Sequence, residues 1–268
     1  MLKMENITYI YEDKTVALED INIDFKNGNK IGIIGSNGAG KSTLFLNCTG
    51  IYKPNKGNIS FNEQPIKYDK KYLYKLREKV GIVFQDPDRQ IFYSNVYDDV
   101  AFGLRNLGID ENIVKKRVDK ALESVGAIEF KDKPVHFLSY GQKKRVAMAG
   151  VLAMESEIIF FDEPTAGLDP IVTESVVNIL EEIHNNGKKI IISSHDMDLI
   201  YRLCDYIYVL NKGKVIEEGI VEDVFLKEDV LKMAGLVEPW LVKIHKNMGL
   251  PLFKDEKELY KYWEKHRE

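Results

Sequence analysis

The chain has 268 residues, 44% of them hydrophobic, and is long enough to bury a substantial core. Its 38 basic and 42 acidic residues give a formal net charge of −4, which argues against a general binder of nucleic acid or anionic membranes. The two cysteines lie far apart without metal-ligand spacing, and no apolar run is long enough for a signal peptide or a transmembrane helix. We expect a globular protein with reduced cysteines that is neither secreted nor membrane-spanning.

Short apolar runs rich in β-branched residues, bounded by Gly, Asn or Asp, predict a series of strands. They cover residues 4–11, 16–25, 30–35, 56–61, 79–84, 157–162, 188–195 and 206–210. Helical patterns lie between them at residues 41–50, 112–126, 141–154 and 170–187. Alternation of continuous apolar strands with helices predicts a parallel α/β core.

Three regions depart from this alternation. VALEDINIDFKNGNK predicts an antiparallel meander with its turn at Asn27-Gly28. Residues 95 to about 155 are mostly helical in pattern and predict a helical subdomain inserted into the core. The strand pattern stops after VIEEG, so we divide the chain into a unit of residues 1–220 and a helical tail of residues 221–268.

The end of the tail carries a helix start signal. Asp255 with Glu258 three positions on resembles a capping box, and it precedes an apolar stripe made of Leu259, Tyr262 and Trp263. The stripe predicts an apolar face on this helix.

GSNGAGKST, residues 35–43, follows the apolar strand KIGII and opens a helix. Its glycines let the backbone N–H groups point inward, so the loop and the helix N-terminus form an anion nest. Lys41 brings a positive charge to the β and γ phosphates, and the Ser42 hydroxyl can ligate Mg²⁺. The loop predicts nucleoside triphosphate binding, common to kinases, GTPases and ATPases, through Gly35, Ser36, Asn37, Gly38, Ala39, Gly40, Lys41, Ser42 and Thr43.

Two carboxylates end the apolar strand EIIFFDE, at the edge where α/β proteins bind ligands. Asp162 is suited to hold Mg²⁺, directly or through water. Glu163 either caps the following turn or acts as general base toward an attacking water, and the phosphate loop favours the base. Asp169 in AGLD is either an ordinary turn residue or a reporter of nucleotide state across an interface.

Polar residues follow two further strands and belong at the same edge. His195 can donate a hydrogen bond to a γ phosphate, although a histidine after a strand is more often a surface residue. The Gln85 amide can touch both the metal and the attacking water, and its alternative role is a strand-end cap. Tyr11 is the best candidate for stacking on a nucleotide base, with Tyr9 as competitor and a core tyrosine as the alternative.

The motifs GSNGAGKST, FQD, LSYGQ, IIFFDEP, AGLD and SSH occur in one order, and together they resemble those of ATP-binding-cassette ATPases over residues 1 to about 220. The resemblance implies a P-loop ATPase core with a parallel sheet, an N-terminal antiparallel β subdomain and an inserted helical subdomain. It also implies ATP and Mg²⁺ as cofactors. The signature, residues 138–142, would meet the γ phosphate held by a second cassette, so two chains would pair head-to-tail. Its contacts would be Ser139, Gly141 and Gln142, with a helix N-terminus favouring the anion.

Tyr140 departs from the commonest signature, LSGGQ, and we expect its side chain to point away from the phosphate. The set of roles thus comprises catalysis by Glu163, His195, Gln85 and Lys41, and Mg²⁺ binding by Ser42, Gln85 and Asp162.

Residues 84–103 and the segment GLVEPWLVKIHKNMGLP resemble cobalt-type (CbiO-like) and energy-coupling-factor importers. This implies a polytopic membrane subunit and a substrate-binding membrane protein as partners, at the cytoplasmic face of the cell membrane, and no nucleic acid. In that family the first segment lines a groove for a coupling helix, although these apolar side chains can instead fill a subdomain junction: Ile91, Phe92, Tyr93 and Phe102. Cobalt or nickel is the implied solute, with vitamins as the alternative, and the 5 histidines show no metal-ligand spacing.

Two rival functions stay open at this point. A non-transport cassette acting on DNA or ribosomes usually has tandem cassettes or coiled coils, which this chain lacks, and a P-loop kinase leaves LSYGQ and His195 unexplained. We also hypothesise that the tail from residue 221 strengthens a cassette dimer.

Overall fold

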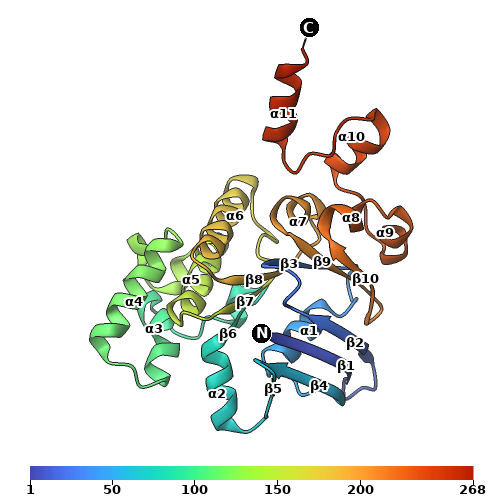
Figure 1. Cartoon of the computed structure of the whole chain (residues 1–268). Helices are drawn as coiled ribbons and strands as arrows, with labels where there is room; N and C mark the ends of the chain where they lie inside the picture. The colour runs from blue at the N-terminus through green and yellow to red at the C-terminus, as the bar shows by residue number, and fades with distance from the viewer. Residues whose placement is uncertain (268) are drawn as a thin grey trace.

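Residues 1–267 are described by a computed structural model, in which two β-sheets are surrounded by helices (Figure 1). The first sheet is antiparallel and has the order β2-β1-β4-β5, formed by Val16–Asp24, Leu2–Ile10, Lys56–Phe61 and Gln64–Pro65. The second has the order β10-β9-β3-β8-β7-β6, formed by Lys214–Ile220, Tyr206–Asn211, Lys30–Ile34, Lys189–Ser193, Ile158–Asp162 and Val80–Val83. Its strands are parallel except β10, which is antiparallel to β9. The predicted α/β class is confirmed.

The predicted meander around Asn27-Gly28 is wrong. The antiparallel partner of β2 is β1, and the Asn27-Gly28 connection carries the chain from the first sheet to the second. A Cβ on Gly28 would lie 2.4 Å from the Asp205 carboxylate, whose oxygens accept hydrogen bonds from the backbone N–H groups of Asn29 and Lys30. Glycine is needed here for this close approach and not for a hairpin turn.

The central strands are buried on both faces, which explains their continuous apolar sequences. Every residue of β7 and β8 is buried. Phe160 of β7 packs its ring 5.5 Å from that of Phe25 and 4.9 Å from that of Phe45, joining the main sheet to α1 (Lys41–Cys48). This packing fixes the carboxyl ends of the parallel strands, where the predicted site residues lie.

A group of helices lies between β6 and β7 in the chain, as expected for residues 95 to about 155. It contains α3 (Val96–Asn106), α4 (Glu111–Ser124) and α5 (Tyr140–Ala153), and it forms the green lobe beside the main sheet in Figure 1. The predicted apolar face of α4, namely Val114, Val118, Ala121 and Leu122, is buried. Three short 3₁₀ turns connect these elements, at Pro87–Arg89, Ile128–Phe130 and Val135–Phe137.

Helices flank the main sheet elsewhere. They are α2 (Lys70–Lys79), α6 (Pro170–Asn185) and α7 (Met197–Leu203). The sequence patterns missed α2, of which only Leu76 is buried, so that no apolar stripe marks it. Its start is fixed by Asp69, whose side chain accepts a hydrogen bond from the Tyr72 N–H.

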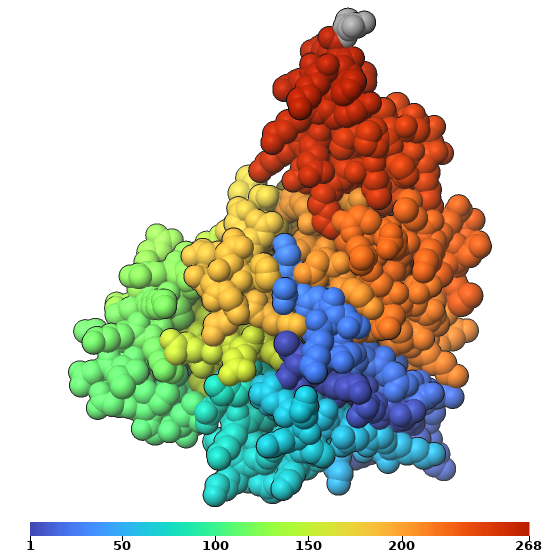
Figure 2. Space-filling model, viewed as in Figure 1, coloured from blue at the N-terminus to red at the C-terminus, as the bar shows by residue number. Residues whose placement is uncertain are grey.

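The helices after β10 do not form a single separate tail. In α8 (Val221–Phe225) and α9 (Glu228–Ala234), apolar side chains such as Val224, Phe225 and Leu231 are buried in the main core. By contrast, α11 (Glu256–Lys265) has no buried residue. Together with α10 (Trp240–Met248), which buries Leu241 and Val242 in the main core, it forms the projecting red segment of Figure 2. Residue 268 lies outside the described residues.

The capping box predicted for α11 forms only in part. Asp255 accepts a hydrogen bond from the Glu258 N–H at 2.9 Å, but the Glu258 side chain returns to Lys254 N–H instead of Asp255 N–H. Leu259 and Tyr262 pack against the core, whereas Trp263 is exposed, so the expected stripe is incomplete. Within residues 1–267, none of the helices combines the length and apolar character needed to span a bilayer.

Candidate functional site

The phosphate loop connects β3 to α1 and curls around a lysine. Gly40 has φ +105°, and a Cβ there would lie 2.6 Å from the Ala17 carbonyl oxygen, so only glycine fits. The ammonium of Lys41 is buried and donates to the carbonyls of Gly35, at 2.8 Å, and Ser36, at 3.3 Å. Burial lowers the pKa of Lys41. In the described residues the hydrogen-bond partners of this buried cation are neutral carbonyls, and Glu163 and Asp162 act on it only through their charge. A phosphate would give it a charged hydrogen-bond partner, so the loop fits a phosphate.

Asp162 is fixed by a hydroxyl of the neighbouring strand. Asp162 and Ser193 are paired across β7 and β8, and the Ser193 hydroxyl donates to Asp162 Oδ1 at 2.6 Å while accepting from the Glu163 N–H at 3.0 Å. In the described residues no hydrogen bond to Asp162 Oδ2 is found. Oxygen ligands suit Mg²⁺, and this carboxylate, the exposed Ser42 hydroxyl and the exposed Gln85 amide provide them. The residues present therefore fit the cation that the resemblance implies.

Glu163 and His195 face each other at the same edge. Glu163 is 5% exposed and has φ +47°, and its Oε2 accepts a hydrogen bond from the His195 backbone N–H at 3.2 Å. Its Oε1 lies 3.0 Å from His195 Nε2, but no hydrogen bond of good geometry reaches it from the described residues. The side chain does not cap the turn after β7, which was the alternative role.

Burial raises the pKa of Glu163, and His195 opposes this rise. A buried carboxylate with a raised pKa and one unpartnered oxygen is suited to accept a proton from water. The His195 ring is partly exposed, so it can also reach a ligand at the strand edge.

Tyr11 and Gln85 lie at opposite sides of this edge. The Tyr11 hydroxyl is 2.7 Å from Thr43 Oγ1, which places the tyrosine beside the phosphate loop. Tyr9 is stacked on Tyr52 with 5.0 Å between ring centroids, so one of its faces is occupied. This favours Tyr11 over Tyr9 as a base platform. No hydrogen bond of the Gln85 side chain to the described residues is found, whereas its backbone carbonyl accepts one from Tyr140.

The signature begins α5 with a capping box. The Ser139 hydroxyl accepts a hydrogen bond from the Gln142 N–H, and Gln142 Oε1 accepts one from the Ser139 N–H at 2.9 Å. In residues 1–267, no hydrogen bond or ion pair joins residues 138–142 to the phosphate loop. Asp169 caps α6, since its carboxylate accepts a hydrogen bond from Val172 N–H at 3.0 Å.

Lys144 is 1% exposed and lies outside the motifs from which the site residues were predicted. Its ammonium donates to the carbonyls of Glu163 at 2.7 Å, Pro164 at 2.9 Å and Ala166 at 3.3 Å. Burial lowers the pKa of Lys144 to about 8. The burial of Lys144 could have been predicted from the sequence, because helical spacing from Ala147, Met148 and Val151 puts position 144 on the buried face. Ser193 was missed as well, for want of any local pattern.

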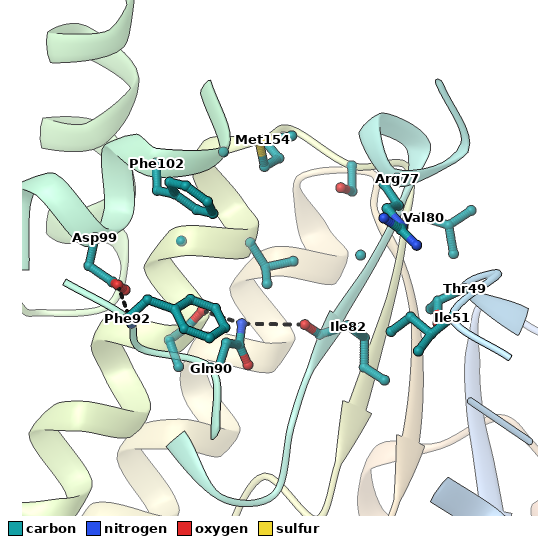
Figure 3. Close-up of a pocket in the computed structure, with 16 residues that line it drawn as sticks. Thr49, Ile51, Arg77, Val80, Ile82, Gln90, Phe92, Asp99, Phe102 and Met154 are labelled. Carbon is teal, nitrogen blue, oxygen red and sulfur yellow. Dashed lines mark hydrogen bonds between the residues drawn. The ribbon is translucent and has the colours of Figure 1, made fainter. Parts of the chain in front are cut away.

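A groove of about 230 Å³ lies between the helical lobe and the main sheet (Figure 3). Phe92 and Phe102 line it, and Phe92 is 74% exposed. The loop that carries Phe92 is held by Asp99, which accepts hydrogen bonds from the Phe92 and Tyr93 N–H groups at 2.8 and 3.0 Å. Burial raises the pKa of Asp99.

Gln90 also fixes this loop. Its amide donates to the carbonyls of Ile82 and Ala147 and accepts a hydrogen bond from Phe84 N–H. The four apolar residues expected here do not behave alike. Ile91 packs against the core, as the junction alternative requires, whereas Phe92, Tyr93 and Phe102 are exposed.

Residues 18–166 match the model of the family described as ABC transporter. The chain belongs to this family. It is 45% identical over 260 residues to the cobalt import ATP-binding protein CbiO of Salmonella paratyphi A, covering 97% of this chain and 96% of that one. It is 48% identical over 240 residues to the energy-coupling factor transporter ATP-binding protein EcfA3 of Clostridium perfringens, covering 89% and 84%.

Two solved structures are also similar. CbiO1 of Clostridium perfringens, described as part of the transporter complex CbiONQ, has a TM-score of 0.77 and 45% identity, with 92% of this chain and 95% of that chain covered. A dimeric ATP-binding cassette in a post-hydrolysis state, bound to ADP and phosphate, has a TM-score of 0.75 and 28% identity, with 82% and 99% covered. The chain is thus an ATP-hydrolysing cassette of the transporter type.

Proposed function

We propose that this chain powers an importer of the cobalt or energy-coupling-factor type, as a head-to-tail pair of cassettes. The observation that carries the proposal is the separation of two half-sites on one chain. The phosphate loop with Asp162, Glu163 and His195 forms one half, and the signature at the head of α5 forms the other. Neither half is complete alone, and a second cassette, of the same or a related chain, supplies what each lacks. The similar cassette solved as a dimer supports this pairing.

In the proposed cycle, Tyr11 stacks on the base and the loop of residues 35–43 encloses the phosphates, with Lys41 at their centre. Ser42, Gln85 and Asp162 would hold Mg²⁺, which would supply charge neutralisation at the phosphates. The partner's signature closes over the γ phosphate through the positions equivalent to Ser139, Gly141 and Gln142, and closure is the state that ATP favours.

Hydrolysis then depends on the buried Glu163 and the partly exposed His195. Glu163 Oε1 accepts a proton from the attacking water, and His195 Nε2 donates a hydrogen bond to the γ phosphate. Loss of the γ phosphate removes the ligand that bridges the two chains, so the pair opens.

The groove lined by Phe92 and Phe102 is the proposed contact to a polytopic membrane subunit, at the cytoplasmic face of the membrane. An exposed aromatic beside an apolar hollow is typical of an interface anchor. A separate membrane protein recognises the solute in this proposal. Cobalt or nickel is the first choice because of the relative named for cobalt import, and a vitamin is the alternative.

The test is to solubilise native membranes gently, capture the tagged chain and identify what accompanies it by mass spectrometry. We expect a polytopic protein and a small apolar membrane protein. Phe92→Asp should reduce their recovery at least about tenfold, as for an interface hot spot, whereas Ile113→Asp, on the exposed side of α4, should not. Recovery with DNA or ribosomes, or equal recovery with both variants, would contradict the proposal.

A further inference from the structure

Tyr140 occupies the signature position where glycine is commonest. Its side chain turns toward the loop after β6 that carries Gln85, which we call the glutamine loop. The hydroxyl donates a hydrogen bond to the Gln85 carbonyl oxygen at 3.2 Å. Burial raises the pKa of Tyr140, so the hydroxyl keeps its proton and its role as donor. Because the acceptor is a backbone carbonyl, this hydrogen bond depends on the position of the loop backbone. It does not depend on the rotamer of the Gln85 side chain.

The Tyr140 ring also rests on the AGLD turn that follows the catalytic carboxylate. A Cβ added to Gly167 would lie 3.3 Å from Tyr140 Cε1, so the ring is packed directly against this residue. A Cβ on Gly141 would likewise lie 3.1 Å from Val172 Cγ1. The first turn of α5 therefore sits on the segment that runs from Glu163 to α6.

Two lysines of the same helix strengthen these contacts. Lys144 holds the carbonyls of Glu163, Pro164 and Ala166, and its ammonium lies 5.8 Å from the Tyr140 ring centroid. Lys143 forms an ion pair with Asp88, three residues beyond Gln85, at 2.7 Å. The head of α5 thus touches both the glutamine loop and the Glu163 segment of its own chain.

We propose that Tyr140 is a positioning residue that couples the two nucleotide sites of a cassette pair. This rests on the proposed head-to-tail pairing. Gln85 belongs to the site of its own chain, whereas the signature completes the site of the partner. A shift of Gln85 toward bound nucleotide pulls on the Tyr140 hydroxyl and so on the helix end that the partner's γ phosphate meets. A glycine at this position has no side chain to make either contact.

The expected effect is limited by the strength of one bond. A neutral hydrogen bond changes an equilibrium by roughly 2- to 13-fold. Tyr140→Phe removes this bond and keeps the ring on Gly167, and Tyr140→Gly removes both contacts. The matched control is Tyr74→Phe on α2, since Tyr74 is also partly exposed and its hydroxyl makes no hydrogen bond to the described residues.

The experiment measures ATP affinity of the isolated chain, and hydrolysis against ATP concentration in the complex captured through the tagged chain. For Tyr140→Phe we expect unchanged affinity and thermal midpoint, a kcat lowered about 2- to 13-fold, and a Hill coefficient that falls toward one. Tyr140→Gly should show the same change to a larger extent, and Tyr74→Phe should match the wild type.

A Hill coefficient and kcat within twofold of wild type in both Tyr140 variants would overturn the coupling role and leave the pairing intact. A fall in thermal midpoint with an unchanged Hill coefficient would also overturn it, because Tyr140 would then be structural only. If the wild-type complex itself hydrolyses ATP without cooperativity and contains one cassette, the proposed pairing and the inference fail together.

Discussion

Replacing Glu163 by Gln tests the assignment of the general base with little change of shape. The amide has nearly the size of the carboxylate, and its oxygen can keep the hydrogen bond from the His195 backbone N–H, at 3.2 Å in the wild type. What is lost is the ability of Oε1 to take a proton, and Oε1 is the oxygen without a hydrogen-bond partner in the described residues. The side chain is buried, so removing its charge should not destabilise the fold.

The magnitude follows from the role assigned to this oxygen. Loss of a general base slows a reaction roughly 10²- to 10⁴-fold. Since each factor of ten corresponds to about 1.4 kcal/mol, the barrier should rise by about 2.8–5.6 kcal/mol. ATP binding should be unchanged, because other residues hold the nucleotide base and the phosphates of ATP. The ATP-bound cassette pair should therefore accumulate.

The assay compares kcat, ATP affinity and the elution volume with ATP for the wild type, Glu163→Gln and Glu157→Gln. Glu157 precedes the same strand at its other end and forms an exposed ion pair with Lys79 at 2.8 Å. Its replacement should leave kcat unchanged, since exposed pairs contribute at most about 1 kcal/mol to stability. Turnover of Glu163→Gln within about tenfold of wild type would refute the assignment.

Two further changes test the base platform and the projecting helix. Tyr11→Ala should weaken ATP binding roughly 5- to 150-fold, the equivalent of about 1–3 kcal/mol of stacking, as measured by calorimetry. Tyr9→Ala should weaken it less, because the Tyr9 ring is stacked on Tyr52, and equal losses would contradict the choice. Deletion of residues 256–268 should lower the thermal midpoint only slightly, since no residue of α11 is fully buried and only Leu259 and Tyr262 pack against the core. If the tail strengthens the dimer, this deletion should raise the dimer dissociation constant in sedimentation, and an unchanged constant would exclude α11 from that role.

The position of the site could be predicted because its residues follow buried strands. Asp162 comes directly after a continuous apolar run, and His195 follows another after two serines. Parallel strands bring such residues to one edge. The phosphate loop was equally accessible, because its glycines are required by the backbone geometry itself, as at Gly40. Site residues whose positions depend on local backbone geometry or on buried parallel strands can therefore be predicted from a single sequence.

Features that depend on tertiary contact were not accessible. Asn27-Gly28 has the composition of a hairpin turn. However, glycine is required there because Asp205, almost 180 residues away in the chain, lies too close for a side chain. The boundary at residue 221 followed the end of the strand pattern, yet Val224 and Phe225 fill the main core. A cut at residue 221 would therefore open this core, at a cost of about 3–5 kcal/mol for losing Phe225 alone, which makes α11 the better deletion.

For Lys144, the sequence predicts burial but not the tertiary contacts. Its helical spacing places it on the buried face, but the spacing does not say which carbonyls it meets. Those carbonyls belong to Glu163, Pro164 and Ala166, so one buried cation fixes the backbone that carries the proposed base to the helix that carries the signature. In a head-to-tail pair these two elements serve different nucleotides. Under the proposed coupling, the Lys144 contacts hold the two elements together while the Tyr140 contact shifts. The reason is that a charge held by three carbonyls resists movement more than a single 3.2 Å hydroxyl contact.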